Sequence, residues 1–254
     1  MKTAQLDMNH KIKESLNAPI NPEMMQFIFN SLPDNQKFDD IRFYKSLVAI
    51  QAIIAEFGSE NRVKILELGA SGLFTELMYK YIPNIEVYHV LGVDYRKVIN
   101  TNQKFDLIIA MEIIEHLGDL DSDNVYVFST FLHTGLDGFF NNLKNNFHQQ
   151  TRMLITTPNV NSYFQLFNLI NCKNPYMYDL HIHEYGVYEL KKILESQFKL
   201  EYYDTMDLLN VNHYGFKPEF IEDITKVFKK YYSSHDLNSI YERGTNIVTV
   251  LKLK

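Results

Sequence analysis

The chain has 254 residues, 46% of them hydrophobic and 22% charged, which suffices for one large domain with a full core. Its formal charge of −6 makes nucleic acid an unfavourable partner, because binding a polyanion depends on neutralising phosphates with Lys and Arg. Cys172 is the only cysteine, which excludes a disulfide within the chain and a cysteine-rich zinc site. No apolar run reaches the length of a signal peptide or a membrane span, so we expect a cytoplasmic protein without membrane insertion.

The first part of the chain has the pattern of helices. Pro22–Leu32 and Ile41–Phe57 carry apolar residues at helical spacing, and the turn-forming residues 33–35 separate them. We therefore expect residues 1–60 to form a helical N-terminal cover and residues 61–254 to form the main domain.

From residue 63 onward, short apolar runs rich in β-formers alternate with helical stretches. The predicted strands are Val63–Leu68, Val87–Val93, Phe105–Met111, Met153–Thr156, Leu200–Asp204 and Ile247–Leu253. Such alternation indicates an α/β fold with a doubly wound, mostly parallel sheet covered by helices on both faces. Ligands of such sheets bind beyond the carboxyl ends of the strands, so we expect the chemistry at that edge.

The first predicted strand turns sharply into a predicted helix, Leu73–Tyr81. Gly69 and Gly72 would let the backbone turn and approach a ligand closely, while the helix start offers free N–H groups. The Gly-x-x-Gly spacing lacks one glycine of the dinucleotide fingerprint. By itself, the pattern fits an ordinary tight β–α turn equally well.

Four motifs in order resemble the class I S-adenosylmethionine-dependent methyltransferases. They are Ile65-Leu-Glu-Leu-Gly69-Ala-Ser-Gly72, Gly92-Val-Asp94, the run from Phe105 through Glu112-Ile-Ile-Glu115-His116 to Leu117, and Leu154-Ile-Thr-Thr-Pro158-Asn159. A fifth segment, His181–Tyr185 followed by Glu189–Leu194, resembles one found in branches that modify cell-surface sugars. The resemblance implies a Rossmann-like sheet of seven strands with an antiparallel last strand.

The same resemblance implies a site for S-adenosylmethionine. The implied cofactor-binding residues are Glu67, Gly69, Ala70, Ser71, Gly72, Asp94, Met111 and Glu112. A tight turn at Gly69–Gly72 would lie under the methionine part, Asp94 would accept both ribose hydroxyls, and Glu67 would lie near the amino-acid end. The alternative for Asp94 is a helix or turn cap.

The chain departs from the family after Asp94. Only Tyr95–Lys104 separates Asp94 from the next predicted strand, which is too short for the usual helix and strand that carry the adenine-binding acid. Either that strand is reduced to an irregular loop, or the second strand is Ile85–Val90.

Glu112, Glu115 and His116 stand at i, i+3 and i+4, which would place them on one face of a helix beginning near Met111. Glu-x-x-Glu-His resembles two O-methyltransferase branches, of ubiquinone biosynthesis and of small-RNA 3′ ends, in which it holds a divalent ion. That resemblance implies His181 as a fourth ligand, a set that suits Mg²⁺, Mn²⁺ or Fe²⁺.

Other roles are open for the same residues. Glu112 could bind cofactor while Glu115 and His116 stabilise a helix start. Without a metal, His116 or His181 could act as general base, because imidazole titrates near neutral pH. The candidate catalytic residues are thus His116, His181 and Glu115.

The resemblance implies an O-methyltransferase acting on a small-molecule acceptor. The His181–Tyr185 segment favours a sugar or sugar nucleotide of surface polysaccharide biosynthesis. We expect acceptor contacts from the cover and from residues 159–185, which contain Tyr163, Phe164, Tyr176, Tyr178 and Asp179.

Several alternatives remain for the function. An aromatic hydroxyl is a possible acceptor within the same class, whereas the acidic charge disfavours an RNA ribose. Another alternative is a non-catalytic binding module that has the cofactor-binding fold but no enzymatic activity. A nicotinamide oxidoreductase is disfavoured by the missing third glycine and by Glu-x-x-Glu-His.

Overall fold

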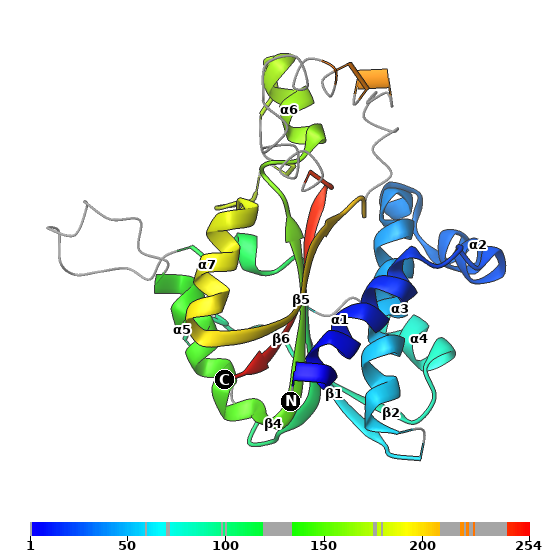
Figure 1. The fold of residues 1–254 in the computed structure, drawn as a ribbon, viewed down its shortest axis with the longest axis vertical. Helices are drawn as coiled ribbons and strands as arrows, with labels where there is room; N and C mark the ends of the chain where they lie inside the picture. The colour runs from blue at the N-terminus through cyan, green and yellow to red at the C-terminus, as the bar shows by residue number, and fades with distance from the viewer. Residues whose placement is uncertain are drawn as a thin grey trace, which may run out of the picture.

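The computed structural model contains one six-stranded sheet with helices on both faces (Figure 1). It describes residues 2–58, 60–69, 72–97, 99, 101–118, 134–174, 177–178, 180–208, 219–220, 222–223, 226 and 243–254. The strands are β1 (Val63–Leu68), β2 (Ile85–Val90), β3 (Phe105–Met111), β4 (Phe147–Pro158), β5 (Phe198–Met206) and β6 (Asn246–Leu253).

The strand order is β2-β1-β3-β4-β6-β5. The first four of these strands are parallel, and β6 runs antiparallel to both β4 and β5. The structure thus confirms a mostly parallel, Rossmann-like sheet with an antiparallel last strand. Order reverses at β1 and β3, where ligands of such sheets bind.

One prediction about the strands needs correction, and a second is not confirmed. The second strand is Ile85–Val90 and not Val87–Val93, because Ile85 already pairs with Val63 and Val90 pairs with Leu68 at the end of β1. Seven strands are not confirmed, since the described residues form six. The described part of residues 91–104 contains no further strand, so β2 is the last strand on its side of the sheet.

The helices divide between the two faces of the sheet. The α-helices are α1 (Lys2–Asn17), α2 (Pro22–Ser31), α3 (Asp40–Ile54), α4 (Gly72–Tyr81), α5 (Thr134–Leu143), α6 (Tyr163–Ile170) and α7 (Val187–Gln197). The 3₁₀ turns are η1 (Asp34–Asp39), η2 (Ala55–Phe57), η3 (Ile114–His116) and η4 (Lys144–Asn146). Figure 1 shows α1 to α4 on one face, α5 and α7 on the other, and α6 beyond the strand ends. None of the described helices is long and apolar enough to cross a membrane.

The N-terminal helices share their core with the sheet. Ile28 of α2 and Leu47 of α3 are fully buried in the same cluster as Ile65 of β1 and Leu107 of β3. Asn21 starts α2 by accepting a hydrogen bond from the backbone N–H of Met24 at 3.0 Å. Because burying one such side chain contributes roughly 1.5–3 kcal/mol, the shared apolar contacts hold the cover on the sheet.

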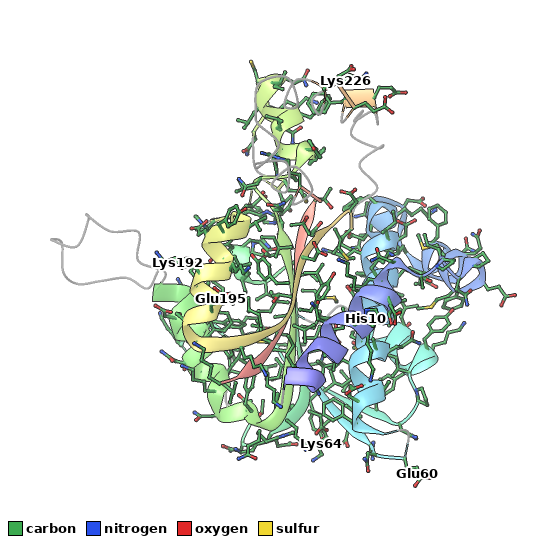
Figure 2. The ribbon with its side chains drawn as sticks, viewed as in Figure 1. His10, Glu60, Lys64, Lys192, Glu195 and Lys226 are labelled. Atoms are coloured by element: carbon green, nitrogen blue, oxygen red, sulfur yellow. The ribbon has the colours of Figure 1, made fainter. Side chains whose placement is uncertain are left out.

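The opposite face is covered by amphipathic helices. In α7, Val187, Leu190 and Leu194 are buried, whereas Lys192 and Glu195 are exposed and point away from the sheet (Figure 2). Residues three and four apart share one face of a helix, so this spacing places these three apolar side chains against the core.

The helix predicted to begin near Met111 is wrong. The backbone N–H of Glu112 still donates to the Thr156 carbonyl at 2.9 Å, which continues the pairing of β3 with β4. Glu112 then has φ +53°, in the left-handed region, and only the 3₁₀ turn η3 follows. Glu112 therefore does not share a helix face with Glu115 and His116.

Candidate functional site

A cavity of about 680 Å³ lies at the carboxyl ends of β1 and β3, on the side of the N-terminal cover. This is the volume of a typical small-molecule site. It is lined by Asn35, Gln36, Phe38, Asp39, Arg42, Phe43, Glu67, Leu68, Gly69, Phe74, Met111, Glu112, His116, Met177, Tyr178 and His181. Segments far apart in sequence thus meet at one edge of the sheet, as the topology predicts.

The corner between β1 and α4 supplies Glu67 and Gly69. Glu67 is buried, accepts a hydrogen bond from Thr75 Oγ1 at 2.7 Å and faces His89 Nδ1 at 3.6 Å. Gly69 has φ +64°, and a Cβ there would lie 2.1 Å from Ile113 Cδ1. The backbone conformation therefore favours glycine, and a Cβ would in addition displace the end of the Ile113 side chain.

The structure does not place the other residues predicted at this corner in the cavity lining. Ala70 and Ser71 fall outside the described residues. Gly72 begins α4 and does not line the cavity.

Asp94 also lies outside the cavity lining. Arg96 holds both of its oxygens, with Nε and one terminal nitrogen each 2.9 Å away, and lowers the pKa of Asp94 to about 2. Its carboxylate is thus engaged by a bidentate ion pair.

Tyr95 bridges the ends of β1 and β2. Its hydroxyl accepts a hydrogen bond from the Gly69 N–H at 3.0 Å and donates one to the Val90 carbonyl at 2.7 Å. Tyr95 is not among the site residues predicted from the sequence. Its position directly after Asp94, at an expected strand end, is the only signal that could have indicated it.

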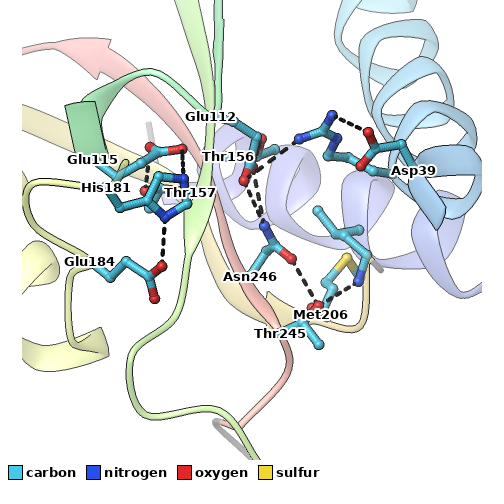
Figure 3. Close-up of polar contacts among 12 residues, drawn as sticks. Asp39, Glu112, Glu115, Thr156, Thr157, His181, Glu184, Met206, Thr245 and Asn246 are labelled. Carbon is cyan, nitrogen blue, oxygen red and sulfur yellow. Dashed lines mark hydrogen bonds and ion pairs between the residues drawn. The ribbon is translucent and has the colours of Figure 1, made fainter. Parts of the chain in front are cut away.

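Glu112 belongs to a polar group that joins the sheet to the cover (Figure 3). It accepts hydrogen bonds from Thr156 Oγ1 at 2.8 Å and Asn246 Nδ2 at 3.1 Å, and lies 3.7 Å from Arg42. Arg42 in turn pairs with Asp39 at 3.0 Å. Arg42 is not among the residues predicted from the sequence, although a cation among the apolar residues of α3 is a usable signal.

Asp39 makes stability depend on pH. Burial raises its pKa from 3.8 to about 6, Arg42 opposes this, and Glu112 and Asp40 raise it further. The folded protein therefore retains a proton on Asp39 over a range in which the unfolded chain has lost it. This contribution to stability is full below about pH 4 and is lost as pH rises through about 6.

We expect Asp39→Asn to remove this dependence. Between pH 4 and 7 the wild type should lose up to about 3 kcal/mol of unfolding free energy that the variant does not lose. This follows because the pKa rises from 3.8 to about 6 on folding, and one pKa unit corresponds to about 1.4 kcal/mol. Urea unfolding across this range measures it. Asp34→Asn is the control, because Asp34 is exposed and its pKa is lowered. Parallel curves for Asp39→Asn and wild type would contradict the prediction.

Glu115, His116 and His181 form a second group at the cavity. Each offers a ligand atom, and these atoms lie within 4.8 Å of one another. The backbone carbonyl of Glu115 accepts hydrogen bonds from the N–H groups of Ile182 and His183, at 2.9 and 3.1 Å. These bonds attach the distant His181 segment to η3 and so bring the three side chains together.

The Glu115 side chain is fully buried, and one of its two carboxylate oxygens accepts a hydrogen bond. Oε2 accepts a hydrogen bond from Thr157 at 2.9 Å, whereas Oε1 has no hydrogen-bond partner among the described residues and lies 3.9 Å from His181 Nε2. Burial, and then the negative charge of Glu112, raise the pKa of Glu115 well above its usual value. A buried carboxylate oxygen without a partner is costly, so a cation there would be stabilised.

The two imidazoles stand edge to face, with ring centroids 4.8 Å apart. Desolvation and the adjacent His181 ring lower the pKa of His116, which favours the neutral form that metals bind. An unpartnered carboxylate oxygen with two imidazoles is a donor set that fits a divalent ion. Glu112, predicted as a fourth member, lies outside this cluster.

The chain is similar to known proteins in its structure but not in its sequence. No protein-family model and no curated protein matches the chain. A structure of the plantazolicin methyltransferase BpumL with SAH covers 100% of this chain and 99% of its own, at 11% identity and TM-score 0.51. A second BpumL structure, with a monoazolic desmethylPZN analog and SAH, covers 100% and 98% at the same identity and TM-score.

The small RNA methyltransferase HEN1 covers 88% of this chain and 26% of its own, at 10% identity and TM-score 0.51. Identities this low carry information on the fold alone. Together with the strand order, these likenesses show that the chain has the Rossmann-like fold seen in these methyltransferases.

Proposed function

We propose that the protein is an S-adenosylmethionine-dependent O-methyltransferase whose site is the cavity at the ends of β1 and β3. One observation carries the proposal: the cavity joins the glycine corner at Gly69 to the Glu115, His116 and His181 cluster. A cofactor-sized space therefore adjoins groups that can activate a hydroxyl.

The charge of the lining supports this cofactor. Asp39, Glu67 and Glu112 line the cavity, and Arg42 is the cation among its described lining residues. A largely acidic lining favours a ligand that carries a positive sulfonium. When bound, S-adenosylmethionine supplies an electrophilic methyl group on that sulfonium.

The residues at the glycine corner would bind the amino-acid part of the cofactor. Glu67 would accept a hydrogen bond from the ammonium group of the cofactor. Because Gly69 has no side chain, the cofactor could approach its backbone closely. Met111 and Glu112 would border it at the end of β3. Ala70 and Ser71 are proposed contacts at the same corner.

Glu115, His116 and His181 would hold a divalent ion. Two imidazoles with one carboxylate suit Mn²⁺ or Fe²⁺ better than Mg²⁺, which prefers oxygen ligands. The ion would supply Lewis acidity that lowers the pKa of an acceptor hydroxyl. Without an ion, His116 or His181 would take the hydroxyl proton as general base.

The favoured acceptor is a sugar or sugar nucleotide of surface polysaccharide biosynthesis. Asn35 and Gln36 line the cavity with amide groups that can hydrogen-bond to hydroxyls, and Phe38 and Tyr178 add aromatic faces. A few polar groups among apolar ones give a pocket its specificity. Much of the catalysis would be alignment of the acceptor oxygen with the methyl group.

Three measurements test the proposal. Calorimetric titration with S-adenosylhomocysteine should show binding; no binding at millimolar concentration would contradict the proposal and favour a non-catalytic module. A screen of nucleotide-linked sugars, with phenols and RNA as comparison sets, should detect a mass gain of one CH₂ group. Phenols methylated in place of sugars would overturn the acceptor class. Full activity in excess chelator would show that methyl transfer does not require a divalent ion.

A further inference from the structure

His181 makes a second contact on the side of its ring away from Glu115. Its Nδ1 lies 2.6 Å from Glu184 Oε1 (Figure 3). The Glu184 side chain is fully buried, and the His181 side chain is 7% exposed. Because the pair is removed from water, this hydrogen bond is stronger than a comparable one at the surface.

Glu184 is itself held by two other donors. The backbone N–H of Met177 donates to its Oε1 at 2.5 Å, and Gln165 Nε2 of α6 donates to its Oε2 at 2.7 Å. Gln165 is also fully buried. These two donors engage both oxygens of Glu184 and so fix the position of the carboxylate as a hydrogen-bond acceptor.

This arrangement defines the state of the His181 ring. Both Glu184 oxygens already act as acceptors for N–H groups, so the contact at 2.6 Å is best made with the ring proton on Nδ1. In a neutral imidazole the other nitrogen, Nε2, then keeps a free lone pair. That nitrogen faces the unpartnered Oε1 of Glu115 at 3.9 Å.

We propose that Glu184 is a positioning residue that holds His181 as the Nδ1–H tautomer and turns Nε2 toward Glu115 and His116. The inference rests on the proposed function, because Nε2 so presented would be the atom that binds the ion or accepts the proton. Carboxylate partners of metal-binding histidines typically contribute tenfold to a hundredfold in metal affinity.

The neighbouring segment provides a matched comparison. His183 Nε2 lies 2.9 Å from Glu189 Oε1, so this is also a histidine and glutamate pair. Its side chains are 32% and 37% exposed, and neither residue lines the cavity. Glu189→Gln therefore makes the same chemical change outside the proposed site.

The first test uses the metal-free full chain. Long-range ¹H–¹⁵N spectra of the imidazoles, with the His181 signals identified by their loss in His181→Ala, should show Nδ1–H in the wild type. In Glu184→Gln the Nε2–H form should appear, and Glu189→Gln should match the wild type. His181 as Nε2–H in the wild type would overturn the proposal, whether or not any variant folds.

The second test is Mn²⁺ affinity, followed by electron paramagnetic resonance. Glu184→Gln should weaken Mn²⁺ binding tenfold to a hundredfold, Glu184→Asp should restore part of it, and the S-adenosylhomocysteine Kd should change less than about twofold. Unchanged Mn²⁺ affinity and tautomer in folded Glu184→Gln would overturn the proposal. A wild type that binds no Mn²⁺ but shows the tautomer change would reject the ion while supporting the role of Glu184.

Discussion

His181→Ala is expected to reduce methyl transfer at least about a hundredfold while changing S-adenosylhomocysteine affinity less than about threefold. The reason is that His181 belongs to the proposed hydroxyl-activating cluster and not to the glycine corner that would bind the cofactor. Removing a group that acts on the proton in the transition state typically costs 10²–10⁴ in rate. Turnover with an identified acceptor and calorimetry with S-adenosylhomocysteine measure the two effects separately.

His183→Ala is the control for this prediction. His183 lies two residues away, pairs with Glu189 and does not line the cavity, so its loss should leave turnover within about twofold of wild type. Equal losses of turnover in the two variants would show that the segment matters only for folding. A His181→Ala enzyme with normal turnover would contradict the assignment.

Gly69→Ala is expected to weaken S-adenosylhomocysteine binding at least tenfold and to destabilise the fold by about 1–2 kcal/mol. Alanine at φ +64° is strained, and its Cβ would lie 2.1 Å from Ile113 Cδ1. The displaced Ile113 side chain and the shifted backbone would both change the cavity wall at the end of β1. Calorimetry and urea unfolding measure the two effects.

Gly72→Ala is the matched control, because a Cβ there meets no atom within 4 Å and the residue begins α4. Alanine at that position should leave binding unchanged and stabilise the helix slightly. Adding Ile113→Ala to Gly69→Ala should relieve the clash but not the backbone strain. Cofactor affinity in Gly69→Ala equal to that of wild type would contradict the proposed location.

The fold follows largely from local patterns in the sequence. The apolar runs at β1, β3 and β6 and the helical spacing at α2 and α3 correspond to the observed elements. Burial of hydrophobic side chains explains why the apolar residues recur at helix or strand spacing. A shift in register would expose these side chains to solvent.

Predictions failed where backbone pairing overrode helical spacing. Glu112, Glu115 and His116 have the spacing of one helix face, but the hydrogen bond from Glu112 to Thr156 extends the ladder of β3 with β4 past the predicted helix start. That partner lies on another strand, and a local pattern contains no information about it.

The sequence by itself determined the α/β architecture, the glycine corner at Gly69 and the adjacency of Glu115 and His116, since each depends on residues close together in the chain. Only the tertiary structure decided that Arg42 reaches Glu112, that Arg96 engages Asp94 and that Glu184 holds His181. Arg42 and Glu112 come from distant segments of the chain. Asp94 and His181 lie in loops, where the direction of a side chain depends on the surrounding packing. Such contacts arise only after the core has set the positions of the elements.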